Sequence, residues 1–202
     1  SLGAFVARGG RLYVPDKTGG RIKVFRDGRL EGQVGTPIAL PTMPHGPPAE
    51  PWSEPVNLRR ARNAPPGHLL APQACAVGPD GTLYVADAEN YRVQPFAADG
   101  TPLRAWGEHG TGEAQLLHVR ALAAAGDGTL WVADSGYGGP VGLRVDHLSR
   151  LRRFDPSGRL LDFVARCGSG PGQVRSPAGL DVDAAGNLWV ADCGNHRVQC
   201  FR

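Results

Sequence analysis

Four pairs of aspartate and arginine are the most regular chemical groups in the sequence. The arginine follows the aspartate by five residues in three pairs and by sixteen in the other. A carboxylate and a guanidinium on opposite strands of a hairpin can form a bidentate ion pair. Because a catalytic residue has no reason to recur in every repeat, we predict that these groups close hairpins and that none is catalytic. The pairs are Asp16 with Arg21, Asp87 with Arg92, Asp134 with Arg150, and Asp192 with Arg197.

Histidine and cysteine are the other residues that could carry chemistry. None of the six histidines has the HxH or HExxH spacing of a metal site. The four cysteines contain no CxxC motif and are expected to be reduced, mostly buried thiols. We therefore predict no metal and no cofactor. The alternative is a zinc site assembled from the loops of several repeats, with ligands from His68, His109, His118 and His196.

These groups occupy fixed places in a repeat. The strings RLYVPD, TLYVAD, TLWVAD and NLWVAD end at the four aspartates, and a glycine lies six residues before each aspartate. Glycine adopts positive φ at little cost and Leu-aromatic-Val runs favour strands, so each string is predicted to be a strand after a tight turn. The aromatic residues of these strings are predicted to pack between neighbouring repeats; they are Tyr13, Tyr84, Trp131 and Trp189.

Each repeat is predicted to contain four short antiparallel strands. In the first copy they cover residues 3–7, 11–16, 21–25 and 29–34, and the outer strand of later copies is PLRAWG or RLLDFVA. The repeats are complete in copies one to three, and the fourth lacks its outer strand. We place them at residues 1–35, 63–107, 108–165 and 166–202, with a Pro-rich insertion at 36–62 and a second insertion at 135–149.

A four-stranded repeat with a period in the forties is typical of a β-propeller. The sequence lacks the Trp-Asp of WD40 repeats, whereas LWVAD, GNHRVQCF at 194–201 and GSGPGQVRSP at 168–177 resemble the NHL family. The resemblance implies an all-β propeller of NHL-type four-stranded antiparallel blades, a family that typically closes six. We therefore expect about four blades of a larger propeller, completed by residues outside this chain or by another chain.

Composition limits the function classes. Lysine and arginine number 22 and aspartate and glutamate 19, so the net charge is +3 and no basic stripe marks a nucleic-acid binder. No apolar run is long enough to span a bilayer, and the first residues lack the features of a signal peptide. We expect a soluble, intracellular protein without membrane insertion.

The NHL resemblance implies partner binding by loops, mostly of proteins and sometimes of RNA. The two insertions are the parts of the chain that do not repeat. We therefore predict a non-enzymatic scaffold that binds a protein partner through them. Their residues best suited to binding are Trp52, Arg59, Arg60, Arg62, Tyr137 and His147.

Two other function classes stay open. Lyases and lactonase-like hydrolases that share six-bladed propellers would need a metal held by several blades, yet only one inner strand offers carboxylates, Asp181 and Asp183. An RNA-binding module would combine the arginines of the first insertion with Arg150, Arg152 and Arg153. These arginines are not interleaved with the aromatic residues on which single strands stack.

Overall fold

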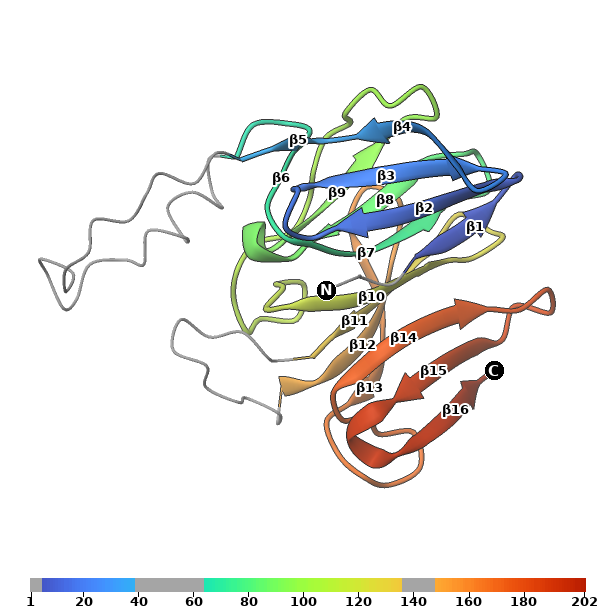
Figure 1. Cartoon of the computed structure of the whole chain (residues 1–202). Coiled ribbons are helices and arrows are strands. Elements are labelled where there is room, and N and C mark those ends of the chain that lie inside the picture. The colour runs from blue at the N-terminus through green and yellow to red at the C-terminus, as the bar shows by residue number, and fades with distance from the viewer. Residues whose placement is uncertain (1–4, 39–63, 136–147) are drawn as a thin grey trace, which may run out of the picture.

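The computed structural model describes residues 5–38, 64–135 and 148–202, and its regular structure is strand apart from short 3-10 turns. Four successive antiparallel sheets form the blades of a propeller (Figure 1), which confirms the predicted fold class. Blade 1 contains β1 (Val6–Arg8), β2 (Arg11–Asp16), β3 (Arg21–Arg26) and β4 (Arg29–Val34), and blade 2 contains β7 (Pro72–Val77), β8 (Leu83–Asp87) and β9 (Arg92–Phe96). Blade 3 contains β10 (Val119–Ala124), β11 (Leu130–Asp134), β12 (Arg150–Phe154) and β13 (Leu160–Arg166), and blade 4 contains β14 (Pro177–Val182), β15 (Leu188–Asp192) and β16 (Arg197–Phe201).

A tight turn joins the first two strands of each blade. In blade 3, Gly128 occupies this turn with φ of 86°, a backbone conformation that favours glycine. The Asp127 carboxylate accepts a hydrogen bond from the backbone N–H of Thr129 at 3.0 Å and so fixes the same turn. The glycine that precedes each aspartate by six residues is therefore a requirement of this turn.

The turn between the second and third strands is a single turn of 3-10 helix in blades 2 and 4, at Ala88–Asn90 and Cys193–Asn195. The residue after it is left-handed, with φ of 53° at Tyr91 and 54° at His196. Each of these residues donates its backbone N–H to the first carbonyl of the turn, at 3.2 Å. His196, the histidine of the NHL motif, thus ends a turn through its backbone.

The outer strand of blade 2 differs from the prediction. Residues 102–107 make only two isolated bridges to β9, Phe96 to Pro102 and Val93 to Trp106. Pro95 lies in the middle of β9 and has no N–H to donate to a ladder, and the Gln94 side chain donates to the Leu103 carbonyl at 2.8 Å. The expectation of three complete blades is therefore wrong for blade 2.

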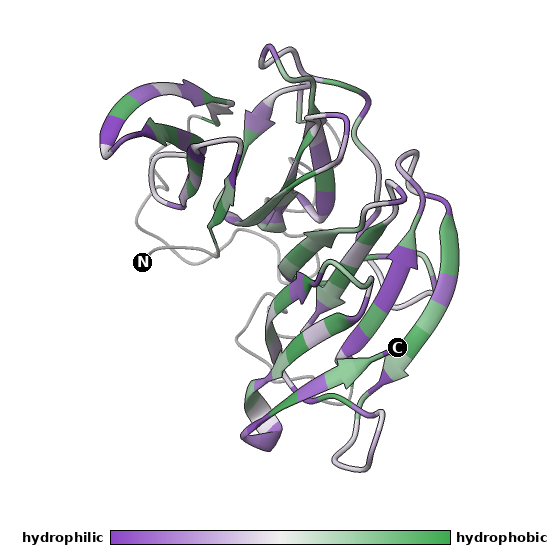
Figure 2. Ribbon diagram, turned by 90° about the vertical axis from the view of Figure 1, so that its right-hand side faces the viewer, coloured by the Kyte–Doolittle hydropathy of each residue, from purple (hydrophilic) through white to green (hydrophobic). Residues whose placement is uncertain are grey.

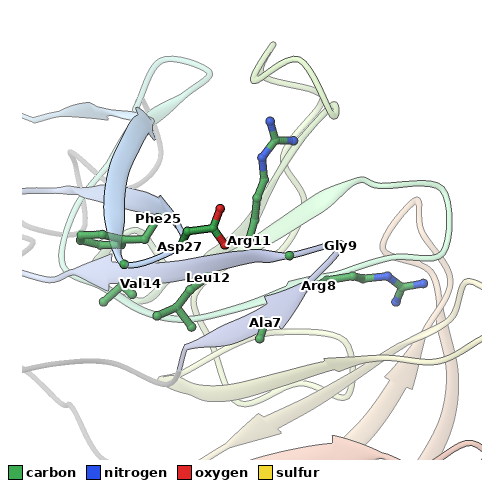
Figure 3. Close-up of a pocket in the computed structure, with 10 residues that line it drawn as sticks. Ala7, Arg8, Gly9, Arg11, Leu12, Val14, Phe25 and Asp27 are labelled. Atoms are coloured by element: carbon green, nitrogen blue, oxygen red, sulfur yellow. The ribbon is translucent and has the colours of Figure 1, made fainter.

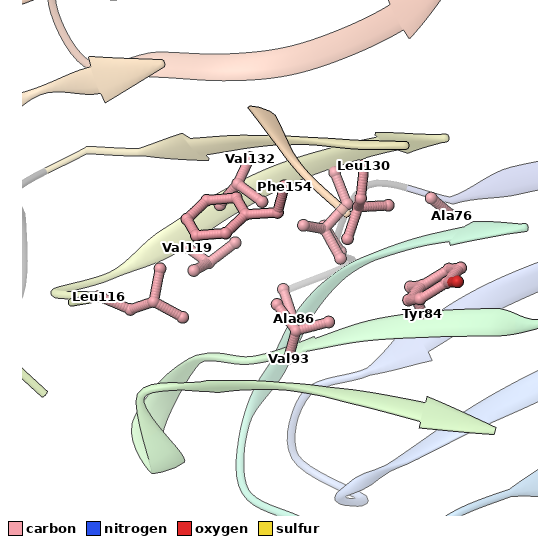
Figure 4. Packing of buried hydrophobic residues seen from close by; sticks show 11 residues of the cluster. Ala76, Tyr84, Ala86, Val93, Leu116, Val119, Leu130, Val132 and Phe154 are labelled. Carbon is pink, nitrogen blue, oxygen red and sulfur yellow. The ribbon is translucent and has the colours of Figure 1, made fainter. Parts of the chain in front are cut away.

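The blades pack face to face through apolar side chains. Several strands carry runs of apolar residues (Figure 2), and all five residues of β8 are buried, because successive side chains of a strand point to opposite faces and both faces of this blade are covered. Figure 4 shows the cluster between blades 2 and 3, in which Tyr84, Leu130 and Phe154 are at most 4% exposed. Tyr13 and Trp131 pack against the clusters between blades 1 and 2 and between blades 3 and 4. These three aromatic residues lie between blades as predicted.

Hydrogen bonds within the described part of the chain fix the ends of both insertions. Strand β5 (Thr36–Pro37) pairs in parallel with β6 (His68–Leu69). In blade 3, Ser135 and Ser149 are fully buried; the Ser149 hydroxyl donates to the Ser135 carbonyl at 3.3 Å and accepts the backbone N–H of Ser176 at 3.0 Å. The second insertion therefore begins and ends inside the fold.

Candidate partner-binding face

The turns between the second and third strands and the connections that enter the inner strands lie at one end of the blades. We call this end the turn face. The first insertion leaves the described chain in the connection between β4 and β7, and the second leaves it between β11 and β12 (Figure 1). Both insertions therefore start from the turn face.

In blade 2, Asp87 is the central acceptor of the hydrogen bonds at the turn face. Its carboxylate is fully buried and accepts the backbone N–H of Leu70 at 2.7 Å and Arg92 Nε at 2.9 Å. The other guanidinium nitrogens of Arg92 donate to the carbonyls of Ala64 and His68, at 2.8 and 2.7 Å. The pair therefore ties the β8–β9 turn to the connection that enters β7.

Blade 4 repeats this arrangement. Asp192 accepts the backbone N–H of Arg175 at 2.6 Å and Arg197 Nε at 2.9 Å. Arg197 Nη2 donates to the carbonyls of Gly170 and Gln173, at 2.7 and 2.8 Å. The same connection is held by the same pair of residue types.

All four predicted pairs lie within ion-pair distance, but those of blades 2 and 4 do not adopt the bidentate geometry that such a pair can form. In blades 2 and 4 only the Nε of the arginine contacts the aspartate, because the remaining N–H groups bond to carbonyls of the connection. These hydrogen bonds give the backbone carbonyls of the connection a donor. The arginine thus satisfies the connection as well as the carboxylate, a role that a hairpin register alone does not reveal.

Sequence reasoning also missed an asparagine in this arrangement. Asn90 Nδ2 donates to Asp87 at 2.7 Å, and Asn195 Nδ2 donates to Asp192 at 2.8 Å. Each asparagine follows its aspartate by three residues, so the Asp-x-x-Asn spacing in copies two and four was the signal that could have identified it.

Blade 3 differs because its aspartate holds two arginines. Arg150 Nη2 lies 3.0 Å and Arg152 Nη2 lies 3.1 Å from Asp134 Oδ2, and Arg152 is fully buried. Asp134 Oδ1 also accepts the backbone N–H of His118 at 2.7 Å. Arg152 stands in the register position that the other blades fill with Lys23, Gln94 and Gln199.

Blade 1 has the most open version of the pair. Arg21 Nε lies 3.6 Å and Lys23 Nζ 3.0 Å from Asp16 Oδ2, and Arg21 donates to the Gln33 side chain at 3.0 Å. The hydrogen bonds from Lys23 and from the backbone N–H of Gly19 lower the pKa of the Asp16 carboxyl. Within the described chain, Arg21 contacts no connection.

His118 directly precedes β10, the first strand of blade 3, and burial has the largest effect on its pKa. Removal from water lowers the pKa of His118 to about 4, and the charges of Arg120 and Lys17 act in the same direction, against the attraction of Asp134. Its ring lies 3.5 Å from Gln73 Nε2. The imidazole is therefore neutral at pH 7.

The sequence-predicted binding residues of the insertions all lie outside the described residues: Trp52, Arg59, Arg60, Arg62, Tyr137 and His147. The remaining arginines of the alternative RNA site do not form the surface cluster that this site would need. Arg150 and Arg152 are 6% and 0% exposed, and Arg153 points to the opposite face, where it pairs with Asp127 and lies over the Trp131 ring.

The alternative zinc site is not assembled either. The described residues contain no group of three or more His, Cys, Asp or Glu side chains placed to hold a metal. Asp183 instead accepts Trp189 Nε1 and Asn187 Nδ2, each at 2.9 Å.

A family model for the NHL repeat matches residues 175–201, which carry β14 to β16 and the Asp192–Arg197 pair. The chain therefore carries an NHL repeat in its fourth blade. Protein brain tumor from Drosophila melanogaster is 27% identical to it over 135 residues, which are 67% of this chain and 12% of that protein. This chain thus spans only a small part of the curated relative that it matches.

Solved structures agree with this fold. A chain of the nidogen/laminin complex matches with a TM-score of 0.62 at 18% identity, over 99% of this chain and 59% of that chain. Virginiamycin B lyase from Staphylococcus aureus matches with a TM-score of 0.53 at 14% identity, over 99% of this chain and 55% of the lyase. Such low identities show the propeller fold alone. Among the described residues, no helix has the length and apolar character needed to cross a membrane.

Proposed function

We propose that the NHL propeller is a non-enzymatic scaffold that binds a protein partner through the two insertions on its turn face. One observation carries the proposal: the recurring polar groups of this face are occupied within the chain. Asp87, Asp134 and Asp192 are fully buried, and their arginines bond to the connections. Recognition of a specific partner must therefore come from the parts that do not repeat.

The fixed ends of the insertions support this role. The β5–β6 pairing and the buried Ser135–Ser149 contact give each insertion a rigid base on the turn face. A rigid scaffold that presents variable loops is a common basis of recognition. The tryptophan and arginine residues of the first insertion and the Tyr137 and His147 of the second are of the types that dominate binding energy at interfaces.

The proposal is tested by replacing the insertions while keeping their anchors. Residues 39–63 and 136–147 are exchanged, singly and together, for Gly/Ser segments of equal length, so that β5, Ser135 and Ser149 remain. Circular dichroism and the thermal midpoint should stay unchanged, and a photo-crosslinker at position 52 or 137 of the unchanged chain should join a partner protein. A crosslinker at Arg104, which lies in the outer segment of blade 2, is the matched control.

The scaffold proposal fails if partner binding survives the double replacement. It also fails if the purified protein binds a stoichiometric metal and turns over an ester or amide, which would establish the enzyme alternative.

We further propose that additional blades cover the outer faces of blades 1 and 4. Leu12, Val14 and Phe25 line a cavity of about 730 Å³ on the outer face of blade 1 (Figure 3). On blade 4, Trp189 is 44% and Val198 67% exposed. Trp189 has the register place of Tyr84 and Trp131, which lie between blades. A longer chain that carries flanking blades should protect Trp189 fluorescence from acrylamide, and equal quenching in both chains would contradict this.

A further inference from the structure

Blade 3 gathers three arginines at its turn-face end. Arg152 is specific to this blade, since the other blades have lysine or glutamine in its place. Arg166 lies directly opposite Arg150 in the β12–β13 ladder, whereas the chain reaches Gly35 in blade 1 and Gly107 in blade 2 at the same point. Like charges directly opposite each other destabilise a sheet. Blade 3 therefore carries a concentration of positive charge that the repeat does not require.

The described carboxylates do not balance this charge. Asp134 is the one described carboxylate that contacts Arg150 and Arg152. Glu113 lies 4.0 Å from Arg166, but both side chains are at least 70% exposed, so water screens their attraction. Among the residues that the structure describes, one guanidinium positive charge thus remains without a buried counter-charge, and burial of an unbalanced charge is costly.

The competition for Asp134 also leaves donors unused. In blades 2 and 4 the arginine Nε donates to the aspartate, whereas in blade 3 Arg150 reaches Asp134 through Nη2. The Nε atoms of Arg150 and Arg152 are consequently buried without a hydrogen-bond partner. Arg150 is only 6% exposed. An orphaned charged donor adds to the cost of the buried positive charge.

A cavity of about 330 Å³ adjoins these groups. Arg150 and Arg166 provide its charged wall, and Arg166 lies over the Phe163 ring with its guanidinium carbon 4.0 Å from the ring centre. Leu148 and Phe163 provide apolar surface, and Thr111 and Glu113 also line the cavity. The lining therefore combines an unbalanced positive charge with an aliphatic and aromatic wall.

We propose that this cavity is an anion site that takes the carboxylate of an aliphatic acid. One negative charge balances the excess, whereas a phosphate dianion would add repulsion from the neighbouring Glu113. The apolar wall of Leu148 and Phe163 fits the hydrocarbon part of the acid. The carboxylate belongs either to a small free acid or to a glutamate side chain of a polypeptide. The site does not depend on the scaffold proposal, because a free acid binds without any partner protein.

The test uses the whole chain labelled with nitrogen-15, in which the Arg150 Nε–H resonance reports on the site. Butyrate is titrated as the free acid and acetyl-Gly-Glu-Gly-amide as the polypeptide source. Butyramide, inorganic phosphate and chloride at matched ionic strength are the controls. We expect butyrate to shift the resonance saturably and butyramide to leave it unchanged. Binding of butyrate alone assigns the site to free acids, and tighter binding of the peptide assigns it to a glutamate side chain.

Two variants connect the signal to the cavity. Arg166→Gln removes an exposed rim charge, and Arg152→Gln restores the residue type that blades 2 and 4 have at this position, so both should fold. Each should weaken butyrate binding at least about tenfold. Arg153→Gln, on the same strand but on the other face, should leave it unchanged. The proposal is overturned if chloride or phosphate shifts the resonance as strongly as butyrate, or if Arg166→Gln binds butyrate as tightly as the unchanged chain.

Discussion

Blade 3 and blade 1 contain the same aspartate–arginine pair in two different environments. The Asp134 side chain is fully buried with Arg150 and Arg152, which are 7% and 0% exposed in their side chains. The Asp16 side chain is 17% exposed, and its partners Arg21 and Lys23 are 35% and 41% exposed. One sequence motif therefore gives a buried ion cluster in one blade and a solvated ion pair in the other.

The difference comes from the connection that precedes the blade. Arg150 donates to the carbonyls of Thr111 and Gly112 at 2.8 and 2.9 Å, so the connection between blades 2 and 3 covers the pair. In blade 1, Arg21 donates to the Gln33 side chain on the same sheet. The arginine therefore contributes most where a neighbouring blade supplies carbonyls and excludes water.

The largest effect should follow from Asp134→Asn. The substitution keeps the shape of the side chain but leaves Arg150 and Arg152 buried without a carboxylate, and removal of one partner from a buried pair costs about 3–5 kcal/mol. Urea unfolding at neutral pH measures the loss. A loss below about 1 kcal/mol would show that the backbone carbonyls alone stabilise both guanidiniums.

The pH dependence of blade 3 gives the next largest effect. The pKa of His118 falls from 6.5 to about 4 on folding, so below pH 6.5 the unfolded chain binds a proton that the folded chain excludes. The stability contribution is therefore present above the unfolded pKa and is lost as the pH falls toward 4. Between about pH 8 and pH 4.5 the loss should be about 2.5 kcal/mol.

The measurement compares unfolding free energies of the unchanged chain and of His118→Gln at both pH values. The difference between the two proteins should change by the stated amount, which removes the contribution of all other titrating groups. An unchanged difference would mean that folding does not lower the pKa of His118.

The aromatic layer allows an interior and an end position to be compared directly. Trp131 packs against the cluster between blades 3 and 4, whereas Trp189 has the same register place in blade 4 and is 44% exposed. Trp131→Ala should cost about 2 kcal/mol, less than a fully buried ring, and Trp189→Ala below about 1 kcal/mol. Thermal and urea unfolding measure both. Equal losses would show that the outer face of blade 4 is already covered in solution.

The parts of the fold that depend on a few neighbouring residues were predicted correctly. The errors arose where the structure depends on contacts between residues far apart in the sequence. The second strand of blade 1 was predicted at residues 11–16 and found there, because a glycine turn and a Leu-aromatic-Val run act within a few residues. The outer strand of blade 2 failed at Pro95, whose missing N–H matters only once its ladder partner is known.

The candidate site was less predictable for the same reason. The ion pairs could be predicted from the spacing of aspartate and arginine in the sequence. The carbonyls that accept hydrogen bonds from the same arginines lie 24 to 39 residues away in the chain. Arg152 looked like part of a surface charge cluster, and only the register of β12 places it beside Asp134. Neighbouring arginines in a sequence do not reveal which of them faces the buried side of the strand until the register of the strand is known.

The smallest effect should follow from Asp16→Asn, the matched counterpart of Asp134→Asn. The partners of Asp16, Arg21 and Lys23, keep contact with water, and exposed ion pairs contribute about 0.2–1 kcal/mol to the free energy of unfolding. Since the pKa of Asp16 is lowered in the fold, its contribution is present at neutral pH and is lost as the pH falls below the usual range of an aspartate. Salt should weaken it further, because water and ions reach both partners. Urea unfolding of the variant at low and high salt tests this, and a loss as large as that of Asp134→Asn would mean that blade 1 is covered by a neighbour in solution.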